Sequence, residues 1–87
     1  MNGRARVAWN LRRIRVDRGL SQESLAVDAD IDRTYISGLE RQEFNPSLDL
    51  LERLAVALSV DLCDLVAPLK PDAVTPEPLK AGRRPKR

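Results

Sequence analysis

The 87-residue chain contains no histidine, a single cysteine, and one residue each of tryptophan, tyrosine and phenylalanine. Without histidine it lacks the commonest general base and metal ligand. No paired-carboxylate or phosphate-loop pattern takes its place. We therefore expect no enzymatic activity, no metal, no cofactor and no small-molecule ligand.

Two further absences concern location. Cys63 has no second cysteine to pair with, so an internal disulfide is excluded, which fits a reducing cytoplasm. No apolar run approaches the roughly 18–20 residues that span a bilayer. We expect a cytoplasmic protein without membrane contact.

What the chain does contain is enough for one small domain. Apolar residues make up 43% of the sequence, and because aromatic residues are so few, the core must be aliphatic. A domain of this size is only marginally stable alone, and dimerisation is one common remedy.

The net charge of +2 hides an uneven distribution. Residues 70–87 carry six basic and two acidic side chains, a net of +4, whereas residues 1–69 carry nine basic and eleven acidic, a net of −2. Arginines nevertheless crowd the beginning of the chain against one acid, Asp17, and such a cluster either meets phosphates or forms a solvated helix face. These arginines are Arg4, Arg6, Arg12, Arg13, Arg15 and Arg18.

Prolines and sparse apolar residues distinguish the end of the chain. They predict a folded domain over residues 1–69 and a flexible tail over residues 70–87. The tail is either a basic arm that adds nonspecific affinity for phosphates or a solvated terminus. We favour the terminus, because prolines separate its charges from the domain.

Apolar residues at helical spacing predict an all-α fold with five short helices and no strand. We expect them at about residues 4–18, 21–28, 33–42, 48–58 and 62–66, and good N-caps precede the last four. The capping residues are Ser21, Asp32, Ser47 and Asp61. The side chains expected to face the core are Val7, Leu11, Ile14, Leu25, Ala26, Ile36, Leu39, Leu48, Leu51, Leu54, Ala55 and Leu58.

The second and third helices are joined by only three residues, 29–31. Helices connected so tightly must cross steeply, and Ala26 supplies the small side chain at their approach. This is the layout of a helix-turn-helix, whose second helix can lie in the major groove of DNA. Short-turn helix pairs are common, so the spacing by itself leaves the function open.

Denser motifs lie in this region: Arg-Gly-Leu-Ser-Gln at 18–22, Thr-Tyr-Ile-Ser at 34–37, Leu-Glu-Arg at 39–41 and Asn-Pro-Ser at 45–47. With them, residues 11–66 closely resemble the Cro/repressor-type helix-turn-helix family, whose members include the phage lambda repressor. The resemblance implies a five-helix domain that binds double-stranded DNA. It also implies a homodimer on a palindromic operator and a role in transcription regulation, with residues 33–42 as the recognition helix.

The same resemblance implies roles for individual residues. Positions facing base edges are Arg33, Thr34, Ser37 and Gly38. Arg33 is the strongest candidate, because its fork can bond guanine O6 and N7. Gly38 has no side chain to read a base. Positions suited to phosphates are Gln22, Tyr35, Asn45, Ser47 and Arg12, although Tyr35 can instead pack against the second helix.

Arg15 and Glu40 match a charged pair that joins the first and third helices in this family, so we expect a partly buried salt bridge. Two departures stand out. Asp30 replaces the usual turn glycine, and Gln42 replaces the glycine that usually ends the recognition helix. The resemblance places the dimer surface near the last helix, where some apolar residues must instead seal the core; the candidates are Val60, Leu62, Leu65, Val66 and Leu69.

Two classes of function remain. The first is a sequence-specific repressor or activator, of which a restriction–modification controller and an autoregulating antitoxin are subtypes; such a protein would associate with the nucleoid when bound to DNA. The second is a protein-interaction module that keeps the fold without DNA binding. The net charge of residues 1–69 and Gly38 favour the module weakly, whereas Arg33 and the arginine-rich first helix favour DNA.

Overall fold

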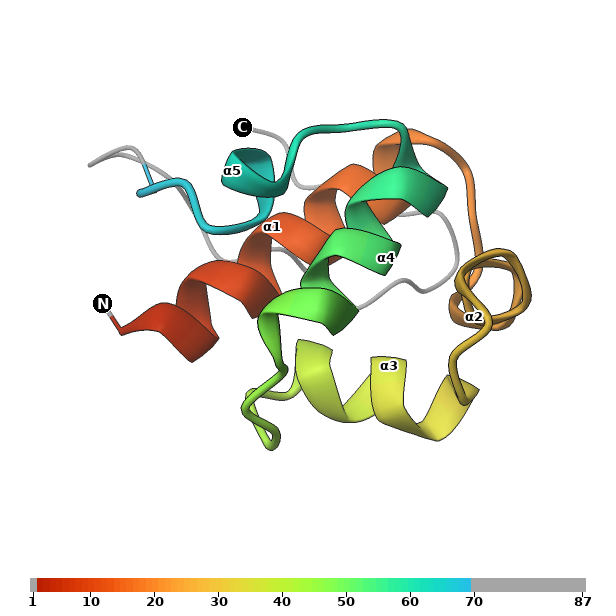
Figure 1. The fold of residues 1–87 in the computed structure, drawn as a ribbon, viewed down its shortest axis with the longest axis horizontal. Helices are drawn as coiled ribbons and strands as arrows, with labels where there is room; N and C mark the ends of the chain where they lie inside the picture. The colour runs from red at the N-terminus through yellow and green to blue at the C-terminus, as the bar shows by residue number, and fades with distance from the viewer. Residues whose placement is uncertain (1, 70–87) are drawn as a thin grey trace, which may run out of the picture.

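The computed structural model describes residues 2–69, and within this range it contains five helices and no strand (Figure 1). The predicted all-α fold is thereby confirmed for this part of the chain. The expected flexible tail, residues 70–87, lies outside the described residues. The helices are α1 (Gly3–Asp17), α2 (Gln22–Ala29), α3 (Arg33–Glu40), α4 (Leu48–Leu58) and α5 (Leu62–Leu65).

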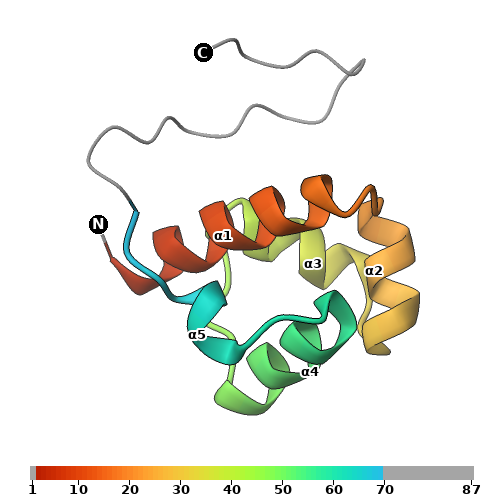
Figure 2. The same ribbon diagram turned by 90° about the horizontal axis from the view of Figure 1, so that it is seen from above.

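The helices enclose one aliphatic core. Figure 2 shows α1 and α4 on opposite sides of the domain, with α2 closing one end. Helix α3 contacts α1 and α2, while the short α5 packs against α4 and α1. Leu11, Leu25, Ile36, Leu54, Leu58 and Leu65 are completely buried, as helical spacing predicts for the first five.

Two apolar residues lie elsewhere than expected. Leu48, the first residue of α4, is 64% exposed and lies outside the core cluster, so its spacing was misleading. Leu65 has no exposed surface. The prediction that Leu65 belongs to a dimer surface is therefore wrong; it is the side chain through which α5 seals the core.

Side-chain caps define most helix starts. The Ser21, Asp32 and Ser47 oxygens accept hydrogen bonds from backbone amides of α2, α3 and α4 at 2.9, 3.1 and 3.1 Å. These caps agree with the sequence pattern. Asn2 does the same for α1, accepting from the Ala5 amide at 2.9 Å.

Three turns use the left-handed backbone conformation without glycine. Asp30, Gln42 and Ser59 have φ values of 59°, 64° and 60°. A side chain in this conformation costs about 1–2 kcal/mol, less for a short polar residue such as Asp. Gln42 thus occupies the conformation that glycine would otherwise provide, and α3 ends at Glu40, two residues earlier than the sequence indicated.

The segment after α5 is tied to the start of α1. The buried Asn10 amide donates to the carbonyls of Leu65 at 3.3 Å and Ala67 at 3.0 Å. Arg6 donates to the Val66 carbonyl at 3.3 Å. Both ends of the described chain therefore lie at one end of the domain (Figure 1). None of the helices formed by residues 2–69 is long and apolar enough to cross a membrane.

Candidate nucleic-acid interface

Helices α2 and α3 are joined by a tight turn that the core holds in place. The Ile31 amide donates to the Ala26 carbonyl at 2.9 Å, while Ala26 and Ala29 are buried. Ile36 and Leu39 anchor the inner face of α3. The opposite face of α3 is left toward solvent, as the second helix of a helix-turn-helix requires.

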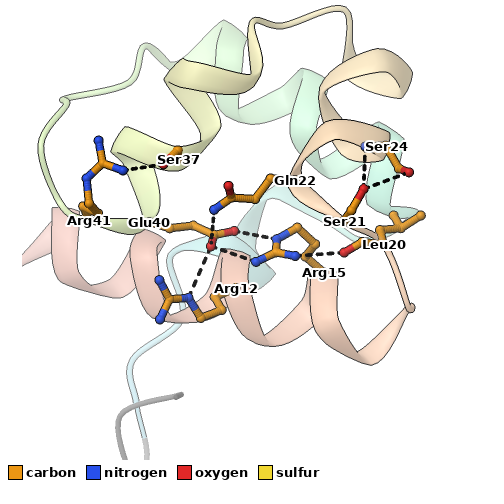
Figure 3. Close-up of polar contacts among 9 residues, drawn as sticks. All are labelled: Arg12, Arg15, Leu20, Ser21, Gln22, Ser24, Ser37, Glu40 and Arg41. Atoms are coloured by element: carbon orange, nitrogen blue, oxygen red, sulfur yellow. Dashed lines mark hydrogen bonds and ion pairs between the residues drawn. The ribbon is translucent and has the colours of Figure 1, made fainter. Parts of the chain in front are cut away.

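The far end of α3 is fixed by one buried carboxylate, Glu40 (Figure 3). Arg15 of α1 binds it with two nitrogens, Nε to Oε2 at 2.7 Å and Nη2 to Oε1 at 2.9 Å. Arg15 also donates to the Leu20 carbonyl at 2.8 Å. The expected Arg15–Glu40 pair is present, and it is more deeply buried than the sequence indicated.

Arg12 and Gln22 join the same carboxylate. Arg12 Nε lies 3.2 Å and Gln22 Nε2 3.1 Å from Glu40 Oε1, so α1, α2 and α3 meet at one side chain (Figure 3). Among the described residues, no buried side-chain nitrogen or oxygen lacks a hydrogen-bond partner. Such a fully hydrogen-bonded network fixes the orientation of α3 relative to α1 and α2, because another arrangement would leave a buried polar group without a partner.

An open cleft lies beside this network. Arg12, Gln22 and Arg33 line it from three different helices, next to the amino end of α2. Three arginines of the cleft, Arg12, Arg15 and Arg33, face two carboxylates, Glu23 and Glu40, which leaves a positive surplus at the cleft. A helix start and surplus cations both favour an anion such as a phosphate. The structure thus brings together two of the expected phosphate residues and the strongest candidate for a base contact.

The outer face of α3 carries the other expected base contacts. Arg33 and Thr34 are exposed at its first turn, and Ser37 is half-buried one turn later. Asp32 caps the helix through the Thr34 amide. In this role its carboxylate is held at the helix start by a backbone contact.

Gly38 does not belong to this exposed face. It is buried, and a Cβ at this position would lie 2.1 Å from Cε2 and 2.5 Å from Cδ2 of Phe44. The prediction that Gly38 faces base edges is therefore wrong. The missing side chain makes room for the Phe44 ring.

Phe44 in turn stacks on Tyr35, with ring centroids 4.6 Å apart and planes 5° from parallel. Tyr35 is half-buried and packs against the core. Tyr35 is thus packed, but its ring partner is Phe44 of the loop after α3, whereas the sequence indicated the second helix. Sequence reasoning missed Phe44, although a lone phenylalanine in a polar loop was an available signal.

Arg41, directly after α3, is the second residue that sequence reasoning missed. Its Nε and Nη2 donate to Oε2 and Oε1 of Glu43 at 2.9 and 3.0 Å. Its Nη1 donates to the Ser37 hydroxyl (Figure 3). The hydrogen bonds from Arg41 lower the pKa of Glu43, and those to Glu43 raise the pKa of Arg41. A charged pair therefore covers the carboxyl end of the recognition helix.

The remaining expected phosphate residues lie in the loop before α4. Asn45 and Ser47 are exposed, and the Ser47 hydroxyl also caps α4. Within residues 2–69, no group of three or more Cys, Asp or Glu side chains lies together in a way that could hold a metal ion.

Apolar residues near α5 show graded exposure. Val66 is 38% exposed, whereas Val60, Leu62 and Leu69 are half-buried. Val56 of α4 is 78% exposed and lines the same groove as Val60 and Leu62. Val56 therefore extends the apolar surface that the sequence placed around α5.

Residues 11–65 match the family model described as helix-turn-helix. A transcription factor of Neisseria meningitidis serogroup B, described as hypothetical, is 45% identical over 65 residues, covering 75% of this chain and 61% of that protein. Control protein C.BamHI of Bacillus amyloliquefaciens is 46% identical over 57 residues, covering 64% of this chain and 70% of its own. The solved structure of the restriction–modification controller C.Esp1396I, a tetramer with its 35 base-pair operator, has a TM-score of 0.68 at 32% identity, covering 76% of this chain and 96% of that one.

Proposed function

Because the chain belongs to the helix-turn-helix family, we propose that it is a sequence-specific transcriptional regulator that binds a palindromic operator in double-stranded DNA as a dimer. The observation that carries the proposal is the position of α3. Its inner face is fixed by the core and Glu40, while Arg33 and Thr34 are exposed on its outer face. A rigid helix with polar side chains outward can enter the major groove.

In this arrangement Arg33, Thr34 and Ser37 read bases. Arg12 and Gln22 bind a phosphate at the cleft beside Glu40, since both line it and both are already held there by the Glu40 carboxylate. Asn45 and Ser47, in the loop between α3 and α4, bind a second phosphate. The phosphate contacts set the register of α3 on the DNA, and the base contacts give the specificity.

The dimer forms through the apolar surface around α5, with Val60, Leu62, Val66 and Leu69 as its expected members and Val56 as an addition. Two recognition helices would then lie about 34 Å apart, one turn of DNA. The operator complex of C.Esp1396I and the similarity to C.BamHI support a regulator of the controller type. We propose no enzymatic activity for it.

A random-sequence DNA library tests this function. The protein should enrich a palindromic site, and Arg33→Ala should reduce discrimination at one base position by about 1–3 kcal/mol. Arg53→Ala is the matched control, because Arg53 is a half-exposed arginine of α4 that pairs with Asp30 and does not belong to the outer face of α3. If the library yields no enriched site and binding is weak at low salt only, the fold serves a protein partner instead.

A further inference from the structure

The exposed ion pair between Arg41 and Glu43 lies outside the core, and neither residue is among the proposed DNA contacts. It lies at the carboxyl end of α3, where the side chain of Arg41 reaches back to Ser37, an expected base contact (Figure 3). Both side chains are 51% exposed. The pair therefore occupies the surface that DNA would approach.

The backbone conformation after α3, and not an interaction of the Glu43 side chain, brings the Glu43 carboxylate next to Arg41. Gln42 reverses the chain with its φ of 64°, and the Glu43 amide donates to the Gly38 carbonyl at 2.9 Å. The next residue, Phe44, is held over Gly38 by its stack on Tyr35. Replacing the Glu43 carboxylate should therefore leave the loop where it is.

Three of the five N–H groups of the Arg41 guanidinium are engaged in this arrangement. Nε and Nη2 bind the two oxygens of Glu43, and Nη1 binds Ser37. A DNA phosphate presents two oxygens in the same geometry as a carboxylate, so it competes for the same fork of donors. Arg41 cannot bind phosphate with this fork while Glu43 holds it.

We propose that Glu43 is a specificity-determining residue of the DNA interface, acting as an internal competitor that withholds the Nε/Nη2 edge of the Arg41 guanidinium from phosphates. This inference rests on the proposed DNA-binding function. Nonspecific binding depends almost entirely on phosphate contacts. The nonspecific affinity therefore loses the whole contribution of the contact that Glu43 blocks. On the operator, base contacts hold α3 close to the groove. A phosphate held near the carboxyl end of α3 can then displace Glu43 from Arg41. Glu43 therefore raises the ratio of operator to nonspecific affinity.

Affinities for an enriched operator and for a nonspecific duplex, measured over a salt series, test this idea. The variants are Glu43→Gln, Arg41→Gln and their combination. Glu43→Gln should raise nonspecific affinity several-fold and steepen its salt dependence by about 0.9 in log–log slope, the value for one phosphate. Operator affinity should rise less, so the ratio falls. The combined variant should lose the nonspecific gain, because no guanidinium is left to release.

Glu52→Gln is the matched control, since it makes the same charge change at an exposed residue of α4. An equal gain from Glu52→Gln would attribute the effect to net charge and overturn the proposal. An equal gain in nonspecific affinity from Glu43→Gln in the wild-type and Arg41→Gln backgrounds would also overturn the proposal. The gain would then come from removing the repulsion between the Glu43 charge and the DNA, and not from releasing Arg41. If the wild type enriches an operator, Arg33→Ala loses discrimination and Glu43→Gln leaves the affinity ratio unchanged, only this inference fails. If the wild type enriches nothing, the proposed function itself fails.

Discussion

Two arginine–glutamate pairs of nearly the same geometry meet at the end of α3, in opposite surroundings. Arg15 binds both oxygens of Glu40 at 2.7 and 2.9 Å, with side chains 2% and 0% exposed. Arg41 binds both oxygens of Glu43 at 2.9 and 3.0 Å, with both side chains 51% exposed. Burial, and not hydrogen-bond geometry, therefore distinguishes the two pairs.

Because of this difference in burial, the Arg15–Glu40 pair is a fixed part of the structure, whereas the Arg41–Glu43 pair can exchange partners. A buried pair gains little over apolar packing, but removing one partner leaves an uncompensated charge in the interior. An exposed pair contributes little because water and salt compete for both groups. Glu40 and Arg41 are adjacent in the chain, so one residue orients the recognition helix while its neighbour stays free to change partner.

Removal of Glu40 should have the largest effect. Glu40→Ala leaves Arg15, Arg12 and Gln22 without their shared acceptor, and we expect a loss of about 3–5 kcal/mol in the free energy of unfolding. Urea denaturation followed by circular dichroism measures it. A loss this large is a substantial share of the total stability of a small domain, so Glu40→Gln provides a milder variant that stays folded.

Replacing both partners sharpens the same point. Arg15→Met combined with Glu40→Leu should destabilise less than Glu40→Leu alone, because the buried Arg15 charge is then removed and only the partly exposed Arg12 still faces the apolar side chain. Equal destabilisation by the two variants would contradict a cost that comes from the unpaired Arg15 charge.

A methyl group at Gly38 should have the next largest effect, because it disturbs the loop that carries the exposed pair. Its Cβ would lie 2.1 Å from the Phe44 ring, and overpacking of this kind costs about 1–3 kcal/mol. In a Phe44→Ala background the sign should reverse, since alanine favours a helix over glycine by about 1 kcal/mol. Thermal denaturation of the four combinations checks this; a loss that persists without Phe44 would exclude the ring as its cause.

Much of the fold could be predicted because it depends on local patterns. Apolar spacing placed Leu11, Leu25 and Ile36 in the core, and Ser21 and Ser47 were identified as caps from residue type. The Arg15–Glu40 pair came from family resemblance, since 25 residues separate the two side chains and no local pattern joins them.

The rest depends on the path of the chain after α3. Gln42 takes a left-handed conformation that propensity does not favour, and this turn carries Phe44 onto Gly38 and Glu43 onto Arg41. Tertiary packing likewise decided that Leu65 is buried while Leu48, at a spacing equally suited to the core, is exposed. Helical periodicity identifies the apolar face of a helix, but it does not show whether another element of the fold covers each residue of that face.

The smallest effect concerns the titration of Glu43. Its pKa is lowered, first by the hydrogen bonds from Arg41, which favour the charged carboxylate. The pair therefore stabilises the fold at pH values above the ordinary glutamate pKa, and this contribution disappears as the pH falls through the lowered value. Because both groups are exposed, the change in unfolding midpoint should be too small to measure, so the titration itself is the readout. Carboxyl-carbon NMR should show Glu43 titrating below its ordinary range in the wild type and closer to that range in Arg41→Gln. The same titration curve in both proteins would mean that Arg41 is not the main partner of Glu43, and the competition proposed for DNA would lose its premise.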